Sequence, residues 1–449
     1  MDRQERLGDG SDAASGHAPA RVLIVPAGTE IGLEARECLA NSKYWKVVGA
    51  NSVRDHSEVV YSELAIGLPF VDNAAFAPSV IQLVRDQQID FVVPAHDDAV
   101  FSLAGIDLGR AKWAGPDRQT ADILRFKSKT YALLRGHVPC PEVFGPAEAP
   151  PSALPLFVKP DRGQGSRGAR RISTVTELDE VSAAASGLLV SEFLPGPEFT
   201  VDCYTDAAGL LRYVSARRRD RIRDGICVRA DEVDPAPFRV FAEAINSRLV
   251  LRGPWFFQMK TAADGDLKLL EVANRVSGTM GFQRERGINL LEAWLHELSG
   301  RTIEFMPWTF GDVVYDRSLA ARAKWSFAVR TVYVDFDDTL VLPGGKLNYR
   351  LVGNLYGLKA NLSARIILIT RHAGQIEDVL SGLGLRGLFD QVHHLKAGEP
   401  KSQCIDPEGA VFIDDSFSER REVWKRWGIP TFPIESLALL EGLNHSALG

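Results

Sequence analysis

The sequence predicts a multidomain α/β protein. Its 449 residues exceed the length of one ordinary core, since domains usually hold about 100–200 residues. Apolar residues make up 45% and charged residues 24% of the chain, which is typical of a folded globular protein. Short apolar segments followed by glycine turns and amphipathic stretches recur along the chain, and this pattern indicates alternating strands and helices.

The charge balance and the cysteine content argue against several classes of function. The chain has 52 Lys and Arg against 58 Asp and Glu, a net charge of −6, so a general nucleic-acid partner is disfavoured. Five scattered cysteines without a CxxC motif indicate a reducing compartment and neither a disulfide framework nor a zinc site. No apolar run approaches the ~20 residues that cross a bilayer, and the N-terminus lacks the apolar region of a secretory signal. We therefore expect a cytoplasmic protein without a membrane partner.

The sequence pattern of the N-terminal part predicts a small doubly wound domain. Residues 1–20 are small and polar, and we expect a disordered lead-in. Residues 21–120 then hold apolar strands such as RVLIVP and DFVVPA with helical stretches between them. The first glycine turn, GTEIG, lacks the GxGxxG fingerprint of dinucleotide sites. His96, Asp97 and Asp98 follow a strand where open sheets place ligand-binding loops, so a substrate contact and a solvated loop both stay open.

A glycine-rich segment follows in the α+β region, which begins near residue 121. Lys159 ends an apolar strand, and Gly163, Gly165 and Gly168 follow it, with Ser166 among them. Glycines let backbone N–H groups approach a phosphate, and a lysine supplies a point charge. The segment is not a P-loop, and by itself it fits a flexible hairpin with a surface lysine equally well.

Further signals accompany this segment. Lys129 lies in a predicted helix upstream of it. Downstream, Glu192 ends an apolar strand that Phe193 and Leu194 continue, and Glu198 starts the next strand. This arrangement suits a hinge strand that meets an adenine, with Glu198 on the ribose hydroxyls.

A predicted hairpin carries metal-binding residue types. Gln258 and Glu271 lie on its two strands, 13 residues apart, and facing oxygen ligands of this kind hold Mg²⁺ against phosphates. Arg275 follows, where it can neutralise charge on a transferring phosphoryl group. Five arginines between residues 217 and 223 fit a carboxylate or phosphate clamp and a solvated face about equally. If this segment is a regular strand, Arg217, Arg219, Arg221 and Arg223 share one side.

This order of elements, over residues 21–310, resembles the ATP-grasp superfamily, and within it the chain resembles carbamoyl-phosphate-synthase-like and pyrrolysine-synthesis-like carboxylate–amine ligases. The resemblance implies a pre-ATP-grasp Rossmann-like domain at 21–120 and an ATP-grasp domain at 121–320. The latter would comprise a lid subdomain (121–190) and a metal and acceptor subdomain (191–320). It also implies ATP with Mg²⁺, or Mn²⁺ as the alternative metal, and an acylphosphate that an amine attacks.

The resemblance also assigns residues. ATP contacts fall to Lys129, Lys159, Gly163, Gly165, Ser166, Gly168, Glu192, Phe193, Leu194 and Glu198, and metal contacts to Gln258, Glu271 and Asn274. The family usually reads E-x-N-P-R at the metal strand, whereas this chain reads EVANR from Glu271 to Arg275. Strand alternation would turn Asn274 away from Glu271, so a site with two protein ligands and more water is the alternative.

The C-terminal part carries a more specific pattern. TVYVDFDDTLV places Asp335 at the end of an apolar strand and Asp337 two residues later, so that one acid can attack while the other transfers a proton. Three further residues come after predicted strands or at a helix start: Thr370, Lys401 and Asp414. A boundary is expected near residues 311–327, where a helical segment leads into this region.

These motifs resemble the haloacid dehalogenase (HAD) superfamily over residues 328–449. The resemblance implies a Rossmann-like phosphatase with Asp335 as nucleophile, Asp337 as general acid and base, and Thr370 and Lys401 on the phosphoryl oxygens. Mg²⁺ would be held by Asp335, Asp337 and Asp414. Only 35 residues separate Asp335 from Thr370, and 31 separate Thr370 from Lys401, so we expect no cap domain.

The combined expectation is a bifunctional enzyme of specialised biosynthesis. One part would join a small-molecule carboxylate to an amine, and the other would hydrolyse a phosphorylated substrate. Two alternatives stay open: a phosphatase with a nucleotide-sensing ATP-grasp module, and a nucleic-acid end-processing phosphatase. A homodimer is a further expectation, because ATP-grasp relatives often dimerise.

Overall fold

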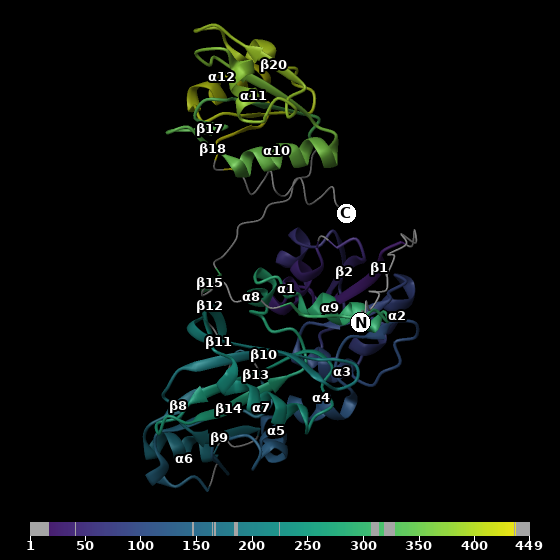
Figure 1. The fold of residues 1–449 in the computed structure, drawn as a ribbon, viewed down its shortest axis with the longest axis vertical. Helices are drawn as coiled ribbons and strands as arrows, with labels where there is room; N and C mark the ends of the chain where they lie inside the picture. The colour runs from purple at the N-terminus through teal and green to yellow at the C-terminus, as the bar shows by residue number, and fades with distance from the viewer. Residues whose placement is uncertain are drawn as a thin grey trace, which may run out of the picture. The chain divides into compact units, whose positions relative to one another are not determined.

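A computed structural model describes residues 18–306, 314–317, 328–434 and 436, except residues 41, 146–147, 164, 166–167, 184–186 and 224. The chain divides into two compact units, residues 1–57 with 64–318, and residues 319–449 with 58–63. Both units mix helices with sheets (Figure 1), which confirms the predicted α/β class. Most of the expected lead-in lies outside the described residues. Among the residues that are described, no helix is both long and apolar enough to span a membrane.

The first sheet of the N-terminal unit is parallel where its pairing is resolved. Its five strands follow the order β3-β2-β1-β4-β5: β1 (Ala20–Val25), β2 (Trp45–Asn51), β3 (Glu63–Ile66), β4 (Phe91–Pro94) and β5 (Lys112–Trp113). β1 pairs in parallel with both β2 and β4. The strand order therefore reverses between β1 and β4, and loops after these two strands meet at the edge where open sheets bind ligands.

Helices cover this first sheet. They are α1 (Glu30–Leu39), α2 (Phe76–Asp86) and α3 (Asp97–Leu103). The short 3₁₀ turn η1 (His56–Val59) lies between β2 and β3 in the chain. Leu23, Val48 and Val92 from three strands pack with Val80 of α2 in one core. The strands are nearly continuous apolar runs because helices bury both faces of such a sheet.

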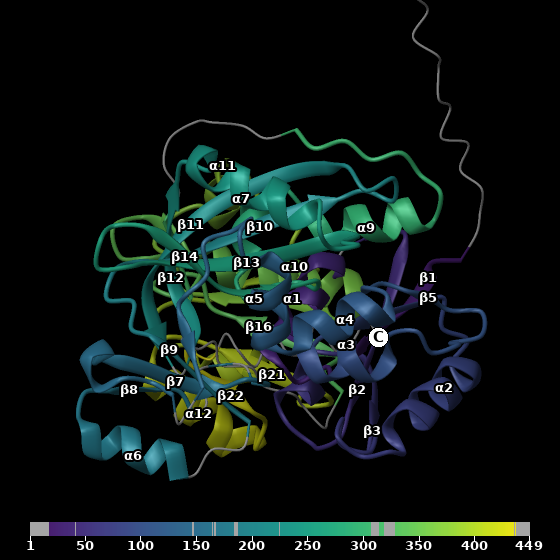
Figure 2. The same cartoon turned by 90° about the horizontal axis from the view of Figure 1, so that it is seen from below.

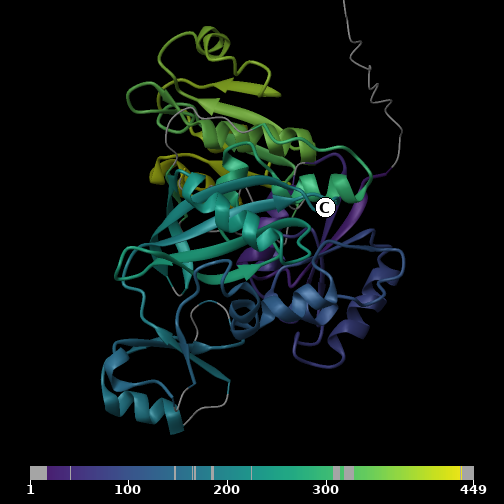
Figure 3. The same ribbon diagram turned by 60° about the horizontal axis from the view of Figure 1, so that its bottom comes forward.

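A smaller four-stranded sheet follows, in the order β6-β9-β7-β8. It comprises β6 (Val143–Phe144), β7 (Leu156–Pro160), β8 (Arg170–Ile172) and β9 (Leu188–Glu192), with α6 (Val175–Ala183) and the 3₁₀ turn η2 (Pro151–Ala153). Figure 3 shows this lobe projecting from the rest of the unit. Two helices precede it, α4 (Arg118–Arg125) and α5 (Lys127–Leu134), and α4 lies beside α3 (Figure 2). Tyr131 and Leu134 of α5 pack in the core of the next sheet, although the expected lid range included them.

The third sheet has six antiparallel strands in the order β14-β13-β10-β11-β12-β15. They are β10 (Glu198–Thr205), β11 (Leu211–Arg223), β12 (Ile226–Val233), β13 (Gly253–Thr261), β14 (Leu267–Ala273) and β15 (Val314–Asp316). Trp255, Phe257 and Met259 alternate along β13 and share one core with Phe238 and Ile245 of α7 (Ala236–Asn246). The helices α8 (Gly281–Glu285) and α9 (Leu290–Leu298) complete the unit.

β15 corrects the expectation of a helical segment at 311–327. Within this range the structure describes residues 314–317, and residues 314–316 form an edge strand that pairs with β12. Val314 and Tyr315 suit an extended backbone, and the β12 edge supplies hydrogen-bond partners that a short helix would lack. The rest of the range lies outside the described residues.

The C-terminal unit contains a five-stranded parallel sheet in the order β20-β19-β16-β21-β22. Its strands are β16 (Thr331–Val334), β19 (Arg365–Thr370), β20 (Gln391–His394), β21 (Ala410–Ile413) and β22 (Thr431–Phe432). Its helices are α10 (Tyr349–Leu362), α11 (Ile376–Gly382), α12 (Phe417–Trp427) and the 3₁₀ turn η3 (Lys401–Cys404). Val332 and Val334 face one core, and Tyr333 between them faces another, so both faces of the sheet are covered.

Only small elements lie between the motif-bearing strands of this unit, in a stretch that the structure describes in full. The hairpin of β17 (Val341–Leu342) and β18 (Lys346–Leu347) and helix α10 separate Asp335 from Thr370. Helix α11 and strand β20 separate Thr370 from Lys401. Neither interval holds a further domain.

Candidate functional site

A cleft in the N-terminal unit gathers most of the residues that the sequence predicts for a nucleotide. Its walls come from the four-stranded sheet (β7, β9) and from the six-stranded sheet (β10, β11, β13, β14). The predicted residues that line it are Lys159, Gly163, Gly165, Glu192, Phe193, Leu194, Glu198, Gln258 and Glu271. Segments more than 100 residues apart in the chain therefore converge on one cavity.

Lys159 lies deep in this cleft, near the end of β7. Its Nζ donates to the Tyr131 hydroxyl at 2.8 Å, and that hydroxyl donates to the Leu270 carbonyl at 2.7 Å. Burial, and secondarily the charge of Lys127, lowers the pKa of Lys159 to about 8. An anion in the cleft would therefore favour its charged form.

Lys127, and not the predicted Lys129, is the lysine of α5 that lines the cleft. The Lys127 Nζ donates to the Gly163 carbonyl at 2.8 Å. The Lys129 Nζ instead lies 2.6 Å from Asp122 Oδ2 at the surface. Two positions apart on a helix differ by about 200° in direction, so only one of the two lysines can face the cleft.

The segment after β9 also lines the cleft. β9 ends at Glu192, so Phe193 and Leu194 follow the strand and do not continue it. The Glu192 side chain pairs with Lys268 at 2.5 Å. Glu198 begins β10, as expected, and forms an ion pair with Arg219.

The glycine-rich segment is described in part. Gly163 and Gly165 line the cleft, whereas Gly168 lies against the Pro160 ring. Gly165 approaches the turn between β11 and β12 so closely that a Cβ added at Gly225 would lie 2.3 Å from the Gly165 carbonyl carbon. Gly225 also has a φ of +78°, which glycine adopts at low cost. Ser166 lies outside the described residues.

Gln258 and Glu271 form the predicted pair of oxygen ligands. They are directly opposite each other in the antiparallel pairing of β13 and β14, which places their Cβ atoms about 4.5–5.5 Å apart. Both line the cleft, and an amide oxygen facing a carboxylate is a donor set that fits Mg²⁺.

Asn274 does not take part in this pair. Its Nδ2 donates to the carbonyls of Arg252 (2.8 Å) and Pro254 (3.0 Å), and its side chain is buried. The asparagine therefore holds the backbone of the neighbouring strand, which corrects its assignment as a metal ligand and agrees with the alternation argument.

A second cavity adjoins the cleft. It is lined by the loop after β1 and the start of α1 (Gly28, Thr29, Glu30, Ile31), by His96 after β4, by strands of the six-stranded sheet and by the segment from Arg275 to Thr279. Arg275 is fixed there by two bonds to Asp97, from Nε at 2.6 Å and from Nη2 at 2.7 Å. Burial alone would raise the pKa of Asp97, but Arg275 lowers it to about 2.

His96, Asp97 and Asp98 are thus not a solvated loop. His96 lines the second cavity and caps α3 by accepting from the Asp98 N–H at 3.1 Å. Asp98 accepts from Arg125 Nη2 at 2.6 Å and also pairs with Arg162. Asp97 therefore holds Arg275 in the wall of the second cavity, and Asp98 holds Arg125 and Arg162.

The arginine run on β11 divides into different environments. The pairing of β11 with β12 is irregular between Arg219 and Ile222, and bulges of this kind redirect side chains. Arg217 is fully buried, Arg219 is 7% exposed and lines both cavities, and Arg221 is 60% exposed beside Asp316. The expected single face of alternating arginines does not form.

Arg217 belongs to a buried polar network beneath the second cavity. It pairs with Asp202 and donates to Thr279 Oγ1 at 2.7 Å and Ser277 Oγ at 3.1 Å. Gln283 also donates to Asp202 at 3.0 Å. Burial lowers the pKa of Arg217 to about 9. This network fixes the segment that carries Ser277 and Thr279.

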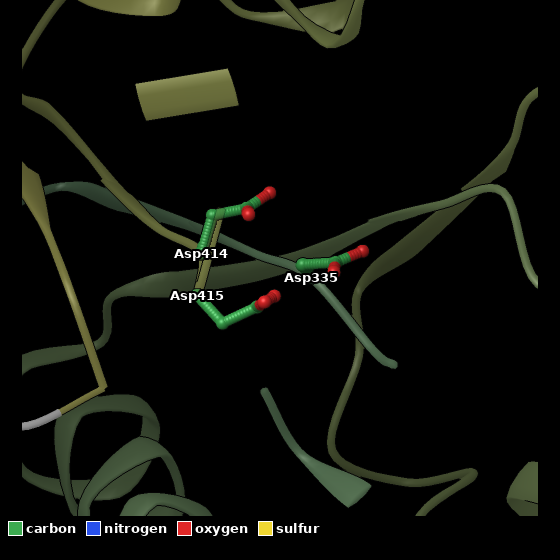
Figure 4. A group of neighbouring side chains, drawn as sticks. All are labelled: Asp335, Asp414 and Asp415. Atoms are coloured by element: carbon green, nitrogen blue, oxygen red, sulfur yellow. The ribbon is translucent and has the colours of Figure 1, made fainter. Parts of the chain in front are cut away.

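A second cluster lies in the C-terminal unit, at the carboxyl ends of parallel strands. Asp335 follows β16, and Asp414 and Asp415 follow β21. Figure 4 shows these carboxylates close together, and ligand oxygens of all three lie within 4.8 Å of one another. The cluster contains the predicted Asp335 and Asp414, and among the described acidic residues Asp415 takes the place expected for Asp337.

Lys401 joins the two buried acids of this cluster. Its Nζ lies 2.7 Å from Asp335 Oδ1 and 2.7 Å from Asp414 Oδ2. Burial raises the pKa of Asp335 to about 7, with Asp414 adding to the rise and Lys401 opposing it. Adjacent carboxylates favour a cation, and the three carboxylates of this cluster are a donor set that fits Mg²⁺.

Asp337 and Thr370 flank the cluster. The Asp337 side chain is 52% exposed and its Oδ1 lies 2.9 Å from His372 Nδ1. Thr370 ends β19, is buried, and its Oγ1 accepts from the His372 N–H at 3.0 Å. All the predicted residues of this unit thus lie at one edge of its sheet, and His372 and Asp415 join them.

Sequence reasoning missed several lining residues. Lys260 lines the cleft, and it lies two residues after Gln258 on the same face of β13. The period of a strand could have indicated it. His372 follows Thr370 in the segment ITRH, but a single histidine carries no signal of its own.

Family comparisons identify the fold around the cleft. Residues 125–224 match the model of the ATP-grasp domain, and residues 184–316 match the model described as "ATP-grasp in the biosynthetic pathway with Ter operon". The two matches together span residues 125–316 and support an ATP-grasp domain there. No protein with curated annotation matches the sequence significantly.

Solved structures share this fold. N5-carboxyaminoimidazole synthetase from Staphylococcus aureus, complexed with ADP, is 14% identical, covers 66% of this chain and 81% of its own, and has a TM-score of 0.54. L-amino acid ligase from Bacillus licheniformis is 20% identical, with 62% and 73% covered and a TM-score of 0.51. The biotin carboxylase domain dimer of Hydrogenobacter thermophilus 2-oxoglutarate carboxylase, with MgADP and bicarbonate, is 14% identical, with 65% and 72% covered and a TM-score of 0.54. At these identities the likeness shows a shared fold and nothing beyond it.

Proposed function

We propose that the N-terminal unit is an ATP- and Mg²⁺-dependent carboxylate–amine ligase. The observation that carries this proposal is the single cleft that joins Lys159, the glycine-rich segment and the Gln258–Glu271 pair. The ATP-grasp family matches support it, as do related folds whose names include an amino acid ligase and ADP complexes.

In this proposal the nucleotide occupies the cleft. Lys127 and Lys159 neutralise its phosphates, residues 192–194 line the adenine, and Glu198 faces the ribose. Gln258 and Glu271 would hold Mg²⁺, which when bound would neutralise charge on the nucleotide phosphates. The carboxylate lies in the adjoining cavity, where Arg275 sits, and its oxygen attacks the γ-phosphorus while ADP leaves. An amine then displaces phosphate from the acylphosphate.

ADP release by the full-length chain tests the ligase. We expect release from ATP and Mg²⁺ only when a carboxylate and an amine, screened first among amino acids, are both present. Glu271→Gln should lower that release at least 100-fold, because it weakens the metal site. ATP binding without carboxylate-dependent ADP release from a broader panel of acids would favour the nucleotide-sensing alternative.

We propose further that the C-terminal unit is an HAD-type phosphatase. The observation that favours it is the contact of Lys401 with both Asp335 and Asp414 at the carboxyl edge of a parallel sheet. Asp335 attacks the phosphorus, the leaving oxygen takes a proton from Asp337, and water then hydrolyses the aspartyl-phosphate. Thr370 and Lys401 hold the phosphoryl oxygens, and bound Mg²⁺ would neutralise the phosphate charge.

Hydrolysis of p-nitrophenyl phosphate by the full-length chain tests this second activity. We expect Mg²⁺-dependent release of p-nitrophenol, which EDTA abolishes and Asp335→Asn lowers at least 1,000-fold, as expected for loss of a nucleophile. Activity on 3′- or 5′-phosphorylated oligonucleotides far above that on small esters would instead favour the nucleic-acid alternative. Mn²⁺ in place of Mg²⁺, and the expected homodimer, are checked in the same preparations by metal exchange and light scattering.

A further inference from the structure

The two cavities of the N-terminal unit share part of their walls. Five residues line both of them: Gly165, Arg219, Gly225, Gln258 and Glu271. Gln258 and Glu271 are the proposed metal ligands, so this shared wall marks the place where a phosphoryl group would pass between nucleotide and acceptor. Among the described residues common to both linings, Arg219 alone carries a positive charge.

One hydrogen-bond donor of the Arg219 guanidinium group has no partner among the described residues. Its side chain is 7% exposed and pairs with Glu198, and its Nη2 donates to the Gly225 carbonyl at 2.9 Å. Its buried Nε has no hydrogen-bond partner among the described residues. Buried donors are usually paired, so an unpaired one in the wall of a cavity indicates a ligand that carries acceptor oxygens.

The neighbouring arginines are placed differently. Arg217 is fully buried, lines neither cavity, and contacts Asp202, Ser277 and Thr279, although its Nε also has no partner among the described residues. Arg218 pairs with Asp231 at 2.7 Å, and the exposed Arg221 lies beside Asp316. Arg219 is therefore the member of this run that the irregular β11–β12 pairing brings to the shared wall.

We propose that Arg219 binds the phosphoryl group while it passes from ATP to the carboxylate, and that it exchanges its partner Glu198 for these oxygens. The proposal rests on the proposed ligase function. When the ribose hydroxyls engage Glu198, the guanidinium group is released toward the γ-phosphate. The bond between the γ-phosphorus and the bridging oxygen breaks, the bond from the carboxylate oxygen forms, and ADP keeps the electron pair. No proton moves, and a permanent cation neutralises the transferring group.

Nucleotides that differ by the γ-phosphoryl group test this proposal. Calorimetry with Mg²⁺ measures the affinity of the full-length chain for ADP and for the non-hydrolysable analogue AMPPNP. We expect Arg219→Gln to lower the affinity for AMPPNP about tenfold or more, as for the loss of a charge-assisted hydrogen bond, and to change that for ADP less than about twofold. Arg219→Lys should give a smaller loss of the same selectivity. Arg221→Gln, on the same strand, is the matched control and should resemble wild type.

Partner exchange has a test of its own. Glu198→Gln should weaken both nucleotides to a similar extent and preserve the wild-type ratio of their affinities. A collapse of that ratio would show that Arg219 depends on Glu198 for its position, and would overturn the exchange.

Other outcomes also decide the proposal. Equal losses for ADP and AMPPNP in Arg219→Gln, or no loss for either, would overturn it. Circular dichroism checks folding, and if Arg219→Gln is unfolded, the selectivity of Arg219→Lys decides. If the wild-type chain binds neither nucleotide, the proposed ligase function fails. If it binds both nucleotides and the Arg219 variants bind them equally well, only the role of Arg219 fails.

Discussion

Lysine side chains set much of the charge of the nucleotide cleft. Lys127, Lys159 and Lys260 line it together with Arg219, opposite the carboxylates of Glu198 and Glu271. Cations in a partly buried site interact more strongly with phosphate than exposed ones do, because less water screens them. The position of each lysine therefore matters more than the number of lysines.

The two lysines of α5 allow a matched comparison. Lys127→Met should weaken ATP binding about tenfold or more, because it removes a cation that lines the cleft. Lys129→Met should change the affinity less than about twofold, because that lysine pairs with Asp122 at the surface. Calorimetric titration with MgATP measures both. Equal losses in the two variants would contradict the assignment of Lys127.

The pKa of Lys159 predicts a pH dependence of nucleotide binding. In the free protein this pKa is about 8, and bound phosphates would raise it. ATP affinity should therefore be constant below pH 8 and fall as the pH rises above 8, where binding must take up a proton. Lys159→Arg keeps the charge at all pH values and should flatten the profile between pH 7.5 and 9.5. A wild-type profile that is flat over that interval would contradict the expectation.

At the scale of elements, two turns meet over the cleft. The glycine-rich segment after β7 and the turn between β11 and β12 come together at Gly165 and Gly225, where a side chain has no room. The contact brings a segment of the smaller lobe against the six-stranded sheet. Its closeness depends on residue 225 being glycine.

Gly225→Ala tests this contact. A Cβ at this position would overlap the Gly165 backbone, so we expect the two turns to separate and the KM for ATP to rise about tenfold or more. Gly209→Ala is the control, because Gly209 also has a positive φ in a turn between strands, but a Cβ there lies 3.4 Å from a flexible arginine side chain. A similar rise in both variants would indicate general strain of the sheet.

Strand patterns predicted this part of the molecule best. The antiparallel pairing of β13 and β14 places Gln258 opposite Glu271 as expected, although the register shifts by one residue between Gln258 and Met259. The arginines of β11 were predicted less well, because bulges interrupt the alternation between Arg219 and Ile222. No residue pattern announces a bulge of this kind, since it depends on the neighbouring strand.

Helices and loops were less predictable. The sequence places two lysines near the start of α5, but the direction of each depends on how α5 packs through Tyr131 and Leu134. The strand β15 was expected to be helical, because its local composition carries no sign of the open β12 edge that it joins. Contacts between distant segments decide both features, and a single sequence does not contain them as a local signal.

At the scale of the whole molecule, the chain carries two sites with separate sets of residues. The cleft and its neighbouring cavity are lined by residues of the N-terminal unit, and the aspartate cluster by residues of the C-terminal unit. Each site has its own proposed metal ligands and its own lysines. Single substitutions should therefore separate the two activities.

Reciprocal variants of the full-length chain check this separation. Glu271→Gln should lower ADP release at least 100-fold and leave hydrolysis of p-nitrophenyl phosphate within about twofold of wild type. Asp335→Asn should do the reverse. Both assays run on the same preparations, with melting curves to confirm folding. Loss of both activities in either variant would show that one site depends on the other.

The segments after β1 and β4, including the start of α1, form a wall of the second cavity that the nucleotide cleft does not share. Gly28, Thr29, Glu30, Ile31 and His96 border that cavity but do not border the nucleotide cleft. Substitutions at these few positions should change which carboxylic acid the protein accepts, while the residues that line the nucleotide cleft stay unchanged. Homologues with divergent loops would then form a natural library of acid preferences, and grafting such loops would offer a direct route to new amide products.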